Sequence, residues 1–488
     1  MVVNSYSFLL FFVVVFVVYY LPVCKKTPLF QNTWLLLVSY VFYGMADWRM
    51  IPLLLGTTVV FWLIGLWLSR EMEKGNTKAA SRITTFSVIL GIAILLYFKY
   101  LNFFIESLAG LLQAIGLQVS WTTLNIILPI GVSFFTFKLI SYIIEIHREH
   151  ILPCKDLTEF AAYIAFFPTI LSGPIDRPDK FLPQMKQVHT LDYTLAADGC
   201  RQILWGMFTK MCIADNLAII TNQAWGGYDH LPSTMLLIAA LLYPIQLYAD
   251  FDGYSNMAIG VGKILGYRVN RNFNHPFLAR NMAEFWRRWH MSLTGWITDY
   301  VFMPLNIAFR NIGNTGIILA AMINLVLIGL WHGANWTYGA FGFYHGLLFI
   351  PLILSGAFGK NKKLKENSHG LPFLKDFCKM LLTYGLVAVG LTIFRADNIS
   401  QAFGFLYSML TNGLSGASII DTYGKLYILF GLMLLAIEWI QRKQEHALQL
   451  QSLHLFSRRS IRYALYLVII LLIITFTGKS QAFIYFQF

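Results

Sequence analysis

Residues 8–21 read Phe-Leu-Leu-Phe-Phe-Val-Val-Val-Phe-Val-Val-Tyr-Tyr-Leu, an apolar run that contains no charged side chain. No basic segment precedes the run, no small-residue cleavage site follows it, and further apolar runs come after it, so it lacks the features of a cleaved signal peptide. Inside lipid, a single segment of this kind satisfies its backbone groups only as an α-helix. We therefore expect the first membrane helix here.

The composition extends this expectation to the whole chain. Of the 488 residues, 57% are hydrophobic and only 12% are charged, and the mean hydropathy is +0.59. Soluble globular domains carry about 25% charged residues, and soluble chains of this length divide into two or more domains. We therefore predict an all-α polytopic membrane protein in which residues 1–488 form a single integral membrane domain.

Twelve apolar runs come close to the length of about 20 residues that a transmembrane helix needs. They predict about 11–12 transmembrane helices, near residues 7–21, 30–46, 51–69, 83–104, 124–146, 200–222, 234–256, 315–335, 336–357, 380–395, 425–441 and 460–477. The run 160–171 is too short to span and ends at Ser172-Gly173-Pro174. We expect it to form a re-entrant or surface-lying segment.

The distribution of Lys and Arg predicts the orientation, because cytoplasmic loops retain positive charge. With the N-terminus outside, 30 of the 37 Lys and Arg residues fall in cytoplasmic segments, which are 22–29, 70–82, 147–158, 172–202, 257–314, 358–379 and 442–462. Both chain termini are then outside the cytoplasmic membrane. The net charge of +13 is explained by this asymmetry, so it is not evidence for nucleic-acid binding.

A polar and aromatic stretch, Phe285-Trp286-Arg287-Arg288-Trp289-His290, interrupts the apolar sequence. Ionisable groups are costly inside a bilayer and usually mark a functional site. Helical spacing places one set of side chains on a single face, namely Trp286, Trp289, His290, Leu293 and Ile297. Glu284 is spaced to pair with Arg287 or Arg288. An ordinary interfacial helix is the alternative explanation for the two arginines.

A second histidine, His332, lies near the end of the apolar run 315–335. Asn335 follows His332 at i+3 and Trp336 follows it at i+4, so one helical face is expected to offer an amide and an indole N–H beside the imidazole. A neutral imidazole is well suited to remove a proton from a hydroxyl near neutral pH, although a structural histidine is the alternative. The topology places His332 near the outer face and His290 on the cytoplasmic side, so the two are expected to bracket the membrane.

Other polar residues lie in or beside apolar runs. Asp250 and Asp252 are expected to end a helix at the inner face, and their spacing directs them to different sides, so we predict orienting or capping roles. His345 is a further candidate, whereas Lys138 is expected to extend its amine towards the interface. No set of His and Cys residues has the spacing of metal ligands, so no metal site is predicted.

Four stretches, in order, resemble the membrane-bound O-acyltransferase (MBOAT) family. The resemblance is strongest to the membrane subunit of bacterial alginate O-acetyltransferases, with the D-alanyl transfer proteins of teichoic acids as a cousin branch. The stretches are Phe167-Pro168-Thr169 to Gly173-Pro174-Ile175-Asp176-Arg177, Asp250-Phe251-Asp252-Gly253-Tyr254-Ser255, Asn272-Phe273-Asn274 through Trp289-His290-Met291-Ser292-Leu293, and Leu330-Trp331-His332-Gly333-Ala334-Asn335-Trp336. They cover a motif-bearing core over 160–345, and the ending Phe483–Phe488 resembles the acetyltransferase branch. The sequence departs from that branch at Asp252, where serine is common, and at Asn306-Ile307, where two glycines are usual.

The resemblance implies a ring of helices around a thin central funnel. It makes His332 the principal catalytic histidine and His290 the second. It also implies a cytosolic thioester donor, either acetyl-coenzyme A or an acyl carrier protein, and transfer of the acyl group to a hydroxyl outside. The acceptor would be an exported polysaccharide or an extracytoplasmic SGNH-type partner protein. Supporting roles then fall to Asn335, Trp336, Trp286, Arg287, Arg288, Trp289, Asp250 and Asp252.

Two other functions remain open from the sequence. D-alanyl transfer to teichoic acid is the first, because Gly173-Pro174-Ile175-Asp176-Arg177 is similar to that branch. A transporter or flippase is the second, since its substrate path could be lined by the same polar residues. Transporters commonly contain two related halves, but here each histidine motif occurs once, in the second half of the chain. We therefore favour an O-acyltransferase, with acetyl as the expected acyl group.

Overall fold

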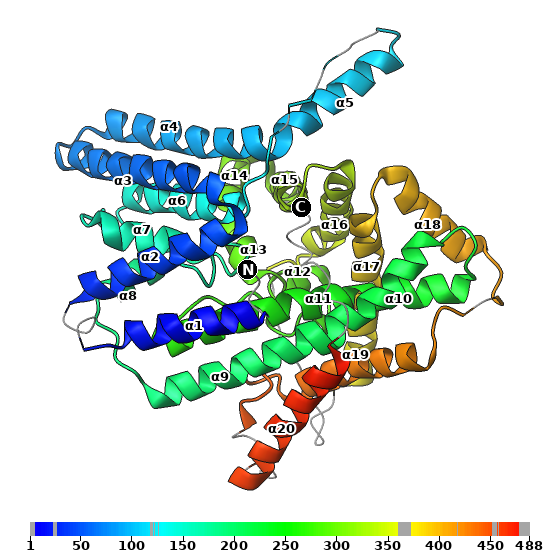
Figure 1. Ribbon diagram of the computed structural model, residues 1–488. Helices are drawn as coiled ribbons and strands as arrows, with labels where there is room; N and C mark the ends of the chain where they lie inside the picture. Colours follow the sequence, from blue (N-terminus) through cyan, green and yellow to red (C-terminus); the bar gives the residue numbers. More distant parts are fainter. Residues whose placement is uncertain are drawn as a thin grey trace. The chain divides into compact units, whose positions relative to one another are not determined.

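The computed structural model describes residues 5–22, 27–117, 121, 123–124, 126–359, 372–416, 418–450, 456 and 458–477. The ending Phe483–Phe488 lies outside these ranges. Throughout them, the regular elements are helices (Figure 1), as the sequence predicts. Contacts divide the chain into unit 1, made of Met1–Cys200 with Ala258–Asn270, and unit 2, made of Arg201–Met257 with Arg271–Phe488. The predicted single domain over 1–488 and its ring around a funnel stay predictions.

Unit 1 contains most of the N-terminal helices. They are α1 (Tyr6–Tyr19), α2 (Pro28–Asp47), α3 (Ile51–Glu73), α4 (Thr77–Leu95), α5 (Leu101–Ala114), α6 (Val132–His147), α7 (Leu157–Ala165) and α8 (Pro178–Met185), with the short elements η1 (Trp48–Met50) and η2 (Leu96–Tyr100). Helix α3 packs against α4, α6 and α7, and α2 packs against α7 (Figure 1). Two helices, α9 (Tyr193–Phe208) and α11 (Ser233–Ile264), contribute residues to both units.

The short apolar run 160–171 is buried within unit 1. It comprises the last part of α7 and the turn that follows, and it is covered on all sides. Lys138 of α6 is only 1% exposed, and its amine donates to the carbonyl of Tyr163 at 3.2 Å and to the hydroxyl of Thr169 at 3.1 Å. The expectation that Lys138 reaches the interface is therefore wrong, because this run supplies the hydrogen-bond acceptors that a buried ammonium needs. The burial also excludes the surface-lying alternative for the run.

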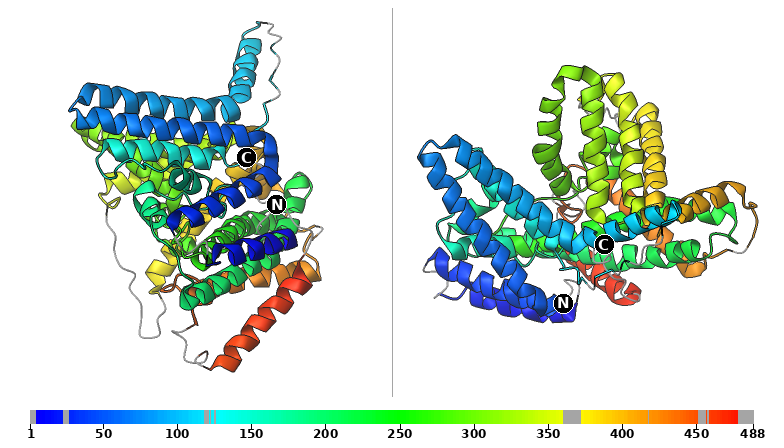
Figure 2. Two further views of the ribbon diagram at one scale, coloured as in Figure 1. Left: turned by 60° about the vertical axis from the view of Figure 1, so that its left-hand side comes forward. Right: turned by 90° about the horizontal axis from the view of Figure 1, so that it is seen from above.

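Unit 2 contains the remaining helices. They are α10 (Asp215–Gly226), α12 (Met282–Trp286), α13 (Met291–Ile297), α14 (Met303–Ala308), α15 (Gly313–His332), α16 (Trp336–Leu354), α17 (Leu374–Arg395), α18 (Ile399–Thr411), α19 (Thr422–Ile440) and α20 (Arg459–Phe476), with the short elements η3 (Thr209–Ala214), η4 (Pro276–Leu278), η5 (Thr298–Phe302) and η6 (Arg310–Ile312). Helices α15, α16 and α17 stand side by side in the right-hand view of Figure 2.

Glycines allow α15 and α16 to pack closely. A Cβ atom added to Gly329 of α15 would overlap the carbonyl oxygen of Tyr338 on α16, and one added to Gly342 of α16 would overlap the carbonyl oxygen of Leu325 on α15. The two backbones are therefore in direct contact. Small residues serve this purpose between membrane helices, where the hydrophobic effect does not drive association.

Across the described ranges, nine helical stretches are long and apolar enough to cross a membrane. Three local features explain why these stretches are fewer than the twelve predicted runs. The runs 30–46 and 51–69 are joined in one stretch, Pro28–Glu73, with only η1 between their helices. Helix α1 has 14 residues. Helix α6 has 16 residues and begins after Gly131, whose φ of 77° interrupts the run 124–146.

The glycine contact between α15 and α16 yields a stability test. We expect Gly342→Ala to destabilise the protein by about 1–3 kcal/mol, the usual cost of overpacking, because its methyl group overlaps the backbone of α15. Gly339→Ala is the matched control on the same helix, since its Cβ would meet only Leu330 Cδ2 at 3.6 Å. The measurement is the thermal unfolding midpoint in detergent. Equal midpoints for the two variants would contradict the close helix contact.

Candidate active site

His332 is the last residue of α15 and is 4% exposed. Its imidazole is enclosed by aromatic rings. The ring centroid lies 5.1 Å from that of Trp331 and 5.1 Å from that of Phe394 on α17, and both rings are nearly perpendicular to it. An apolar enclosure of this kind keeps water away from the imidazole.

His290 lies in a sharp backbone turn and is completely buried. Its φ of 44° is in the left-handed region, and it caps the start of α13. Neighbouring hydrogen bonds hold the turn, since the Met291 N–H donates to the Asn272 carbonyl at 2.7 Å and the Asn274 N–H donates to the Arg288 carbonyl at 3.0 Å. The expectation of a continuous helix through residues 286–297 is therefore wrong. Helix α12 ends at Trp286, and at the break the segment 272–274 both accepts and donates backbone hydrogen bonds.

The two histidines share one site. Their ring centroids are 6.2 Å apart, and Trp331 contacts both rings, with its centroid 5.5 Å from that of His290. The expectation that they bracket the membrane is wrong. That expectation treated residues 257–314 as one cytoplasmic segment. In the structure His290 is buried instead, and the ring centroid of Phe251 on α11 lies 4.7 Å from that of His290 and completes its aromatic environment.

Burial sets the protonation state of His290. Loss of solvation lowers its pKa from the usual 6.5 to about 3, and a hydrogen bond to its own backbone only partly opposes this shift. The charged form of a side chain is the form that burial disfavours. His290 is therefore neutral near pH 7, with one ring nitrogen that donates and one that accepts.

Trp286 and Trp289 support the turn from inside unit 2. The indole N–H of Trp286 donates to Nδ1 of His345 at 3.2 Å, which places the His345 proton on Nε2. Trp289 stacks on Phe285 with ring centroids 5.3 Å apart. Both indoles are buried, but neither is in ring contact with His332. His345, on α16, is thus tied to the His290 segment.

The two arginines of the motif differ in their surroundings. Arg288 donates to Glu284 at 2.8 Å, as the i,i+4 spacing predicts, and Glu284 also accepts from Arg280 at 3.1 Å. Burial opposes ionisation of Glu284, but these arginines hold its pKa below the usual range. Arg287 is exposed, whereas both imidazoles are buried. Arg288 is therefore part of a local ion-pair group, while Arg287 points to the surroundings.

Asn335 and Trp336 lie outside the histidine pair. The helix ends at His332, and Asn335 is the N-cap of α16 instead, where its side-chain oxygen accepts from the Thr337 N–H at 3.0 Å. Its amide nitrogen donates to the Asp397 carbonyl at 2.7 Å, and Trp336 is 59% exposed. The predicted common face with His332 is therefore wrong. Asparagine is a preferred N-cap residue, which is the sequence signal for this break.

Asp250 and Asp252 lie within α11, not at its end, because that helix continues to Ile264. Asp250 forms an ion pair of 2.5 Å with Lys210, which also pairs with Asp215 at 2.7 Å. Asp252 accepts a hydrogen bond of 2.7 Å from Asn256. The two carboxylates do point to different sides, as predicted, but the expectation that they end a helix is wrong.

Four residues that the sequence analysis left out of the site contribute to it. Phe251, Trp331 and Phe394 surround the imidazoles, and Lys210 balances the charge of Asp250. Phe251 and Trp331 lie inside the quoted motif stretches, beside Asp250 and His332, whereas Phe394 belongs to none of these stretches and no sequence pattern connects it with the histidines. A lysine inside the apolar run 200–222 is itself a signal for Lys210. In the described part of the chain, no three His, Cys, Asp or Glu residues are grouped so as to hold a metal ion.

Comparison with known proteins identifies the family. The family model described as MBOAT, membrane-bound O-acyltransferase, matches residues 148–366. The chain is 38% identical to the "probable alginate O-acetylase AlgI" of Pseudomonas aeruginosa over 85% of this chain and 75% of that protein. The chain belongs to the membrane-bound O-acyltransferase family.

Other relatives of this O-acyltransferase are named for different acceptors. The chain is 29% identical to the peptidoglycan O-acetyltransferase of Helicobacter pylori over 81% of this chain and 76% of that protein. It is 34% identical to the teichoic acid D-alanyltransferase of Streptococcus thermophilus over 54% of this chain and 65% of that protein. Family membership and the apolar helices together make it a multi-pass membrane acyltransferase, and they decide against the transporter alternative.

The ion pairs of Lys210 yield a second stability test. We expect Lys210→Met to destabilise the enzyme by about 3–5 kcal/mol, because it leaves two buried carboxylates without their shared cation. Lys74→Met is the control, since Lys74 pairs with Glu71 at the surface with 67% of its side chain exposed, and no measurable change is expected. The readout is unfolding in detergent. A Lys210→Met protein as stable as the control would contradict the charge balance.

Burial of neutral His290 predicts a pH dependence of stability. Between pH 6.5 and 3 the unfolded state binds a proton on His290 that the folded state does not, so stability falls as the pH is lowered through this window. For a shift from 6.5 to about 3 the loss on going from pH 7 to pH 5 is on the order of 2 kcal/mol. His290→Gln should remove this part of the loss, as measured by unfolding midpoints at both pH values.

The exposed His230 supplies the control for this comparison. His230→Gln should lose stability between pH 7 and pH 5 as the wild type does. If His290→Gln lost as much as the wild type, His290 would have to titrate normally in the folded enzyme.

Proposed function

We propose that the enzyme transfers an acyl group, most simply acetyl, from a cytosolic thioester to a hydroxyl outside the cytoplasmic membrane, with His332 and His290 as catalytic residues. The observation that carries this proposal is the pairing of the two motif histidines, with ring centroids 6.2 Å apart in a buried aromatic environment. At this separation both imidazoles are within reach of one small acyl group.

His332 is assigned as the general base. It accepts the proton of the acceptor hydroxyl while that oxygen bonds to the thioester carbonyl carbon, which becomes tetrahedral and carries an oxyanion. The carbon–sulfur bond then breaks, and the proton on His332 passes to the leaving thiolate. The products are an ester and a free thiol. General base catalysis of this kind contributes about 10²–10⁴-fold in rate.

His290 is assigned to the carbonyl oxygen. Because burial keeps its imidazole neutral, it can donate an N–H hydrogen bond to the developing oxyanion without being a competing acid. A donor that is already oriented in a site without water stabilises this charge more than it would in solution. The rings of Trp331, Phe251 and Phe394 exclude the water that would otherwise hydrolyse the thioester.

The donor is assigned to the cytoplasmic side. The charge asymmetry of the loops supports this orientation, with both termini outside. Acetyl-coenzyme A and an acyl carrier protein are both acidic, and an exposed cation such as Arg287 would attract either. Arg288, which is held by Glu284, would position the segment that carries His290.

The acceptor is assigned to the class of exported polysaccharides, reached directly or through an extracytoplasmic SGNH-type partner. Similarity over most of the chain to alginate and peptidoglycan O-acetyltransferases supports this assignment. D-alanyl transfer to teichoic acid is the second candidate, supported by the D-alanyltransferase of Streptococcus thermophilus. The shorter match to that relative, 54% of this chain, makes acetyl transfer the preferred function.

The proposal is tested by the acyl content of the host's exported polysaccharides and teichoic acids. We expect a His332→Ala strain, at wild-type protein level, to lose O-acetyl esters from one polymer by about 10²-fold or more, as expected on removal of a general base. Ester-linked acetate and D-alanine are measured in parallel. Loss of D-alanine instead would assign the enzyme to teichoic acid modification.

His230→Ala, an exposed histidine, is the matched control and should keep wild-type ester levels. Unchanged acetate and D-alanine in the His332→Ala strain would refute the assignment of His332 as the base.

A further inference from the structure

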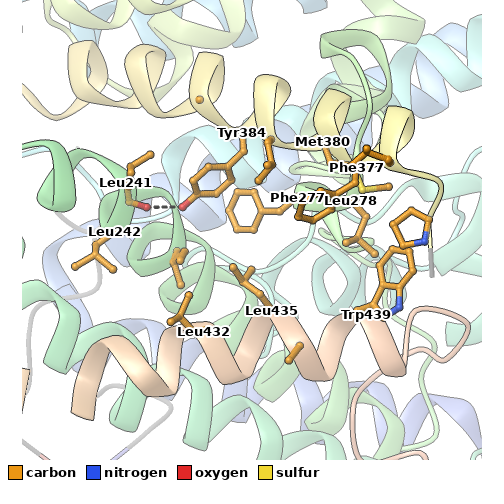
Figure 3. Close-up of a pocket in the computed structure, with 16 residues that line it drawn as sticks. Leu241, Leu242, Phe277, Leu278, Phe377, Met380, Tyr384, Leu432, Leu435 and Trp439 are labelled. Carbon is orange, nitrogen blue, oxygen red and sulfur yellow. Dashed lines mark hydrogen bonds between the residues drawn. The ribbon is translucent and has the colours of Figure 1, made fainter. Parts of the chain in front are cut away.

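An apolar pocket in unit 2 has no role in the proposed reaction. It has a volume of about 860 Å³ and is formed by α11, η4, α17 and α19, as Figure 3 shows. Its lining includes Leu241, Phe277, Phe377, Tyr384, Leu435 and Trp439. None of the sixteen lining residues is charged. The imidazoles of His290 and His332 are not among them.

The pocket offers little to a polar ligand. The hydroxyl of Tyr384 is directed to the carbonyl of Leu241 and hydrogen-bonds to it, as the dashed line in Figure 3 indicates. Apolar cavities do not hold ordered water, because a buried water needs several polar partners. In a membrane protein the apolar material available to fill such a pocket is the hydrocarbon of lipid. The pocket is long enough for an acyl chain, since the lining residues Leu374 and Gly385 are about 16 Å apart along α17 at a rise of 1.5 Å per residue.

One end of the pocket is cationic. Trp439 lines this end, and the guanidinium of Arg442 lies 4.4 Å from the centre of its ring while donating to the Trp439 carbonyl at 2.6 Å. The nearby carboxylate of Asp376 is balanced, since Lys379 lies 3.2 Å and Arg280 3.6 Å from it. An aromatic ring with an arginine is typical of the membrane–water interface.

The sequence also predicts on which side of the membrane the cationic end lies. Pro372 lies within the segment 358–379, and Trp439 lies just before the segment 442–462. The two segments contain 11 of the 37 Lys and Arg residues and are predicted to be cytoplasmic. The cytoplasmic leaflet is the one that basic segments recognise through anionic headgroups. Charge and apolar lining therefore indicate an amphiphile with an anionic head and a hydrocarbon tail.

We propose that this pocket binds an anionic glycerophospholipid of the cytoplasmic leaflet, with one acyl chain between α17 and α19 and its phosphate at Arg442. The lipid would join α11, η4, α17 and α19 without contacting the histidine pair. It is thus a structural ligand, distinct from donor and acceptor.

Gly385→Phe tests the site of the lipid acyl chain. A Cβ on Gly385 meets no atom within 4 Å, so the phenyl ring can enter the pocket without displacing the backbone. The full-length enzyme is purified in detergent with equal amounts of phosphatidylglycerol and phosphatidylcholine of the same chains, and retained lipid is quantified by mass spectrometry after gel filtration. We expect the wild type to retain phosphatidylglycerol and Gly385→Phe to lose most of it.

Gly56→Phe is the matched control, because Gly56 is an exposed glycine of α3 whose added Cβ also meets nothing within 4 Å. It should retain lipid as the wild type does, and acyl transfer is measured in both variants to verify folding. Equal retention by Gly385→Phe and Gly56→Phe would overturn the proposal. So would a co-purifying protein segment in place of lipid.

Arg442→Gln tests the headgroup contact. A single Arg near an anionic lipid surface is worth about a fivefold difference in binding, so the preference for phosphatidylglycerol over phosphatidylcholine should fall about fivefold while total lipid is kept. An unchanged preference would overturn the assignment of the phosphate to Arg442.

Discussion

The backbone contact between α15 and α16 is the constraint on which the candidate active site depends. Gly329 and Gly342 allow each helix to touch the backbone of the other. This contact fixes where α15 ends, and the chain must then turn within the two residues that separate His332 from Asn335, the cap of α16. His332 is therefore held at a defined helix end, with its ring against Phe394 of α17. A looser helix pair would leave the imidazole free to adopt several orientations.

A second constraint follows from the cost of burying polar groups in an apolar bundle. Buried polar groups find partners within the bundle, as the shared contact of Lys210 with Asp215 and Asp250 illustrates. The same requirement breaks the helix at His290, where the segment 272–274 exchanges backbone hydrogen bonds with the turn. Unusual backbone at this point is tolerated because protein groups satisfy it. The break is what directs His290 towards His332.

The sequence predicted the class of fold and the two histidines well, because both depend on composition and local motifs. Apolar run lengths are properties of contiguous residues, and most helices appear where they were expected. The failures at Asn335, Trp336 and the 286–297 segment share one cause: helical periodicity was extended past a break. A capping asparagine signals the first break, but the second depends on hydrogen bonds from residues 272–274, which no local pattern contains. The partner of Asp250 was missed for the same reason, since it lies forty residues earlier in the chain.

The two constraints together explain why the proposed chemistry uses imidazoles and not carboxylates. A carboxylate at the position of His290 would be fully buried among Phe251, Trp331 and the backbone turn, and without a cation it would be forced into its neutral form. Imidazole is already neutral there, so its ring can both donate and accept without a counter-ion. The aspartates of the motif, in contrast, are held in separate contacts: Asp250 pairs with the cation of Lys210, and Asp252 accepts from the amide of Asn256. Neither carboxyl group lies between the two imidazoles, and the space there stays apolar enough to protect a thioester from water.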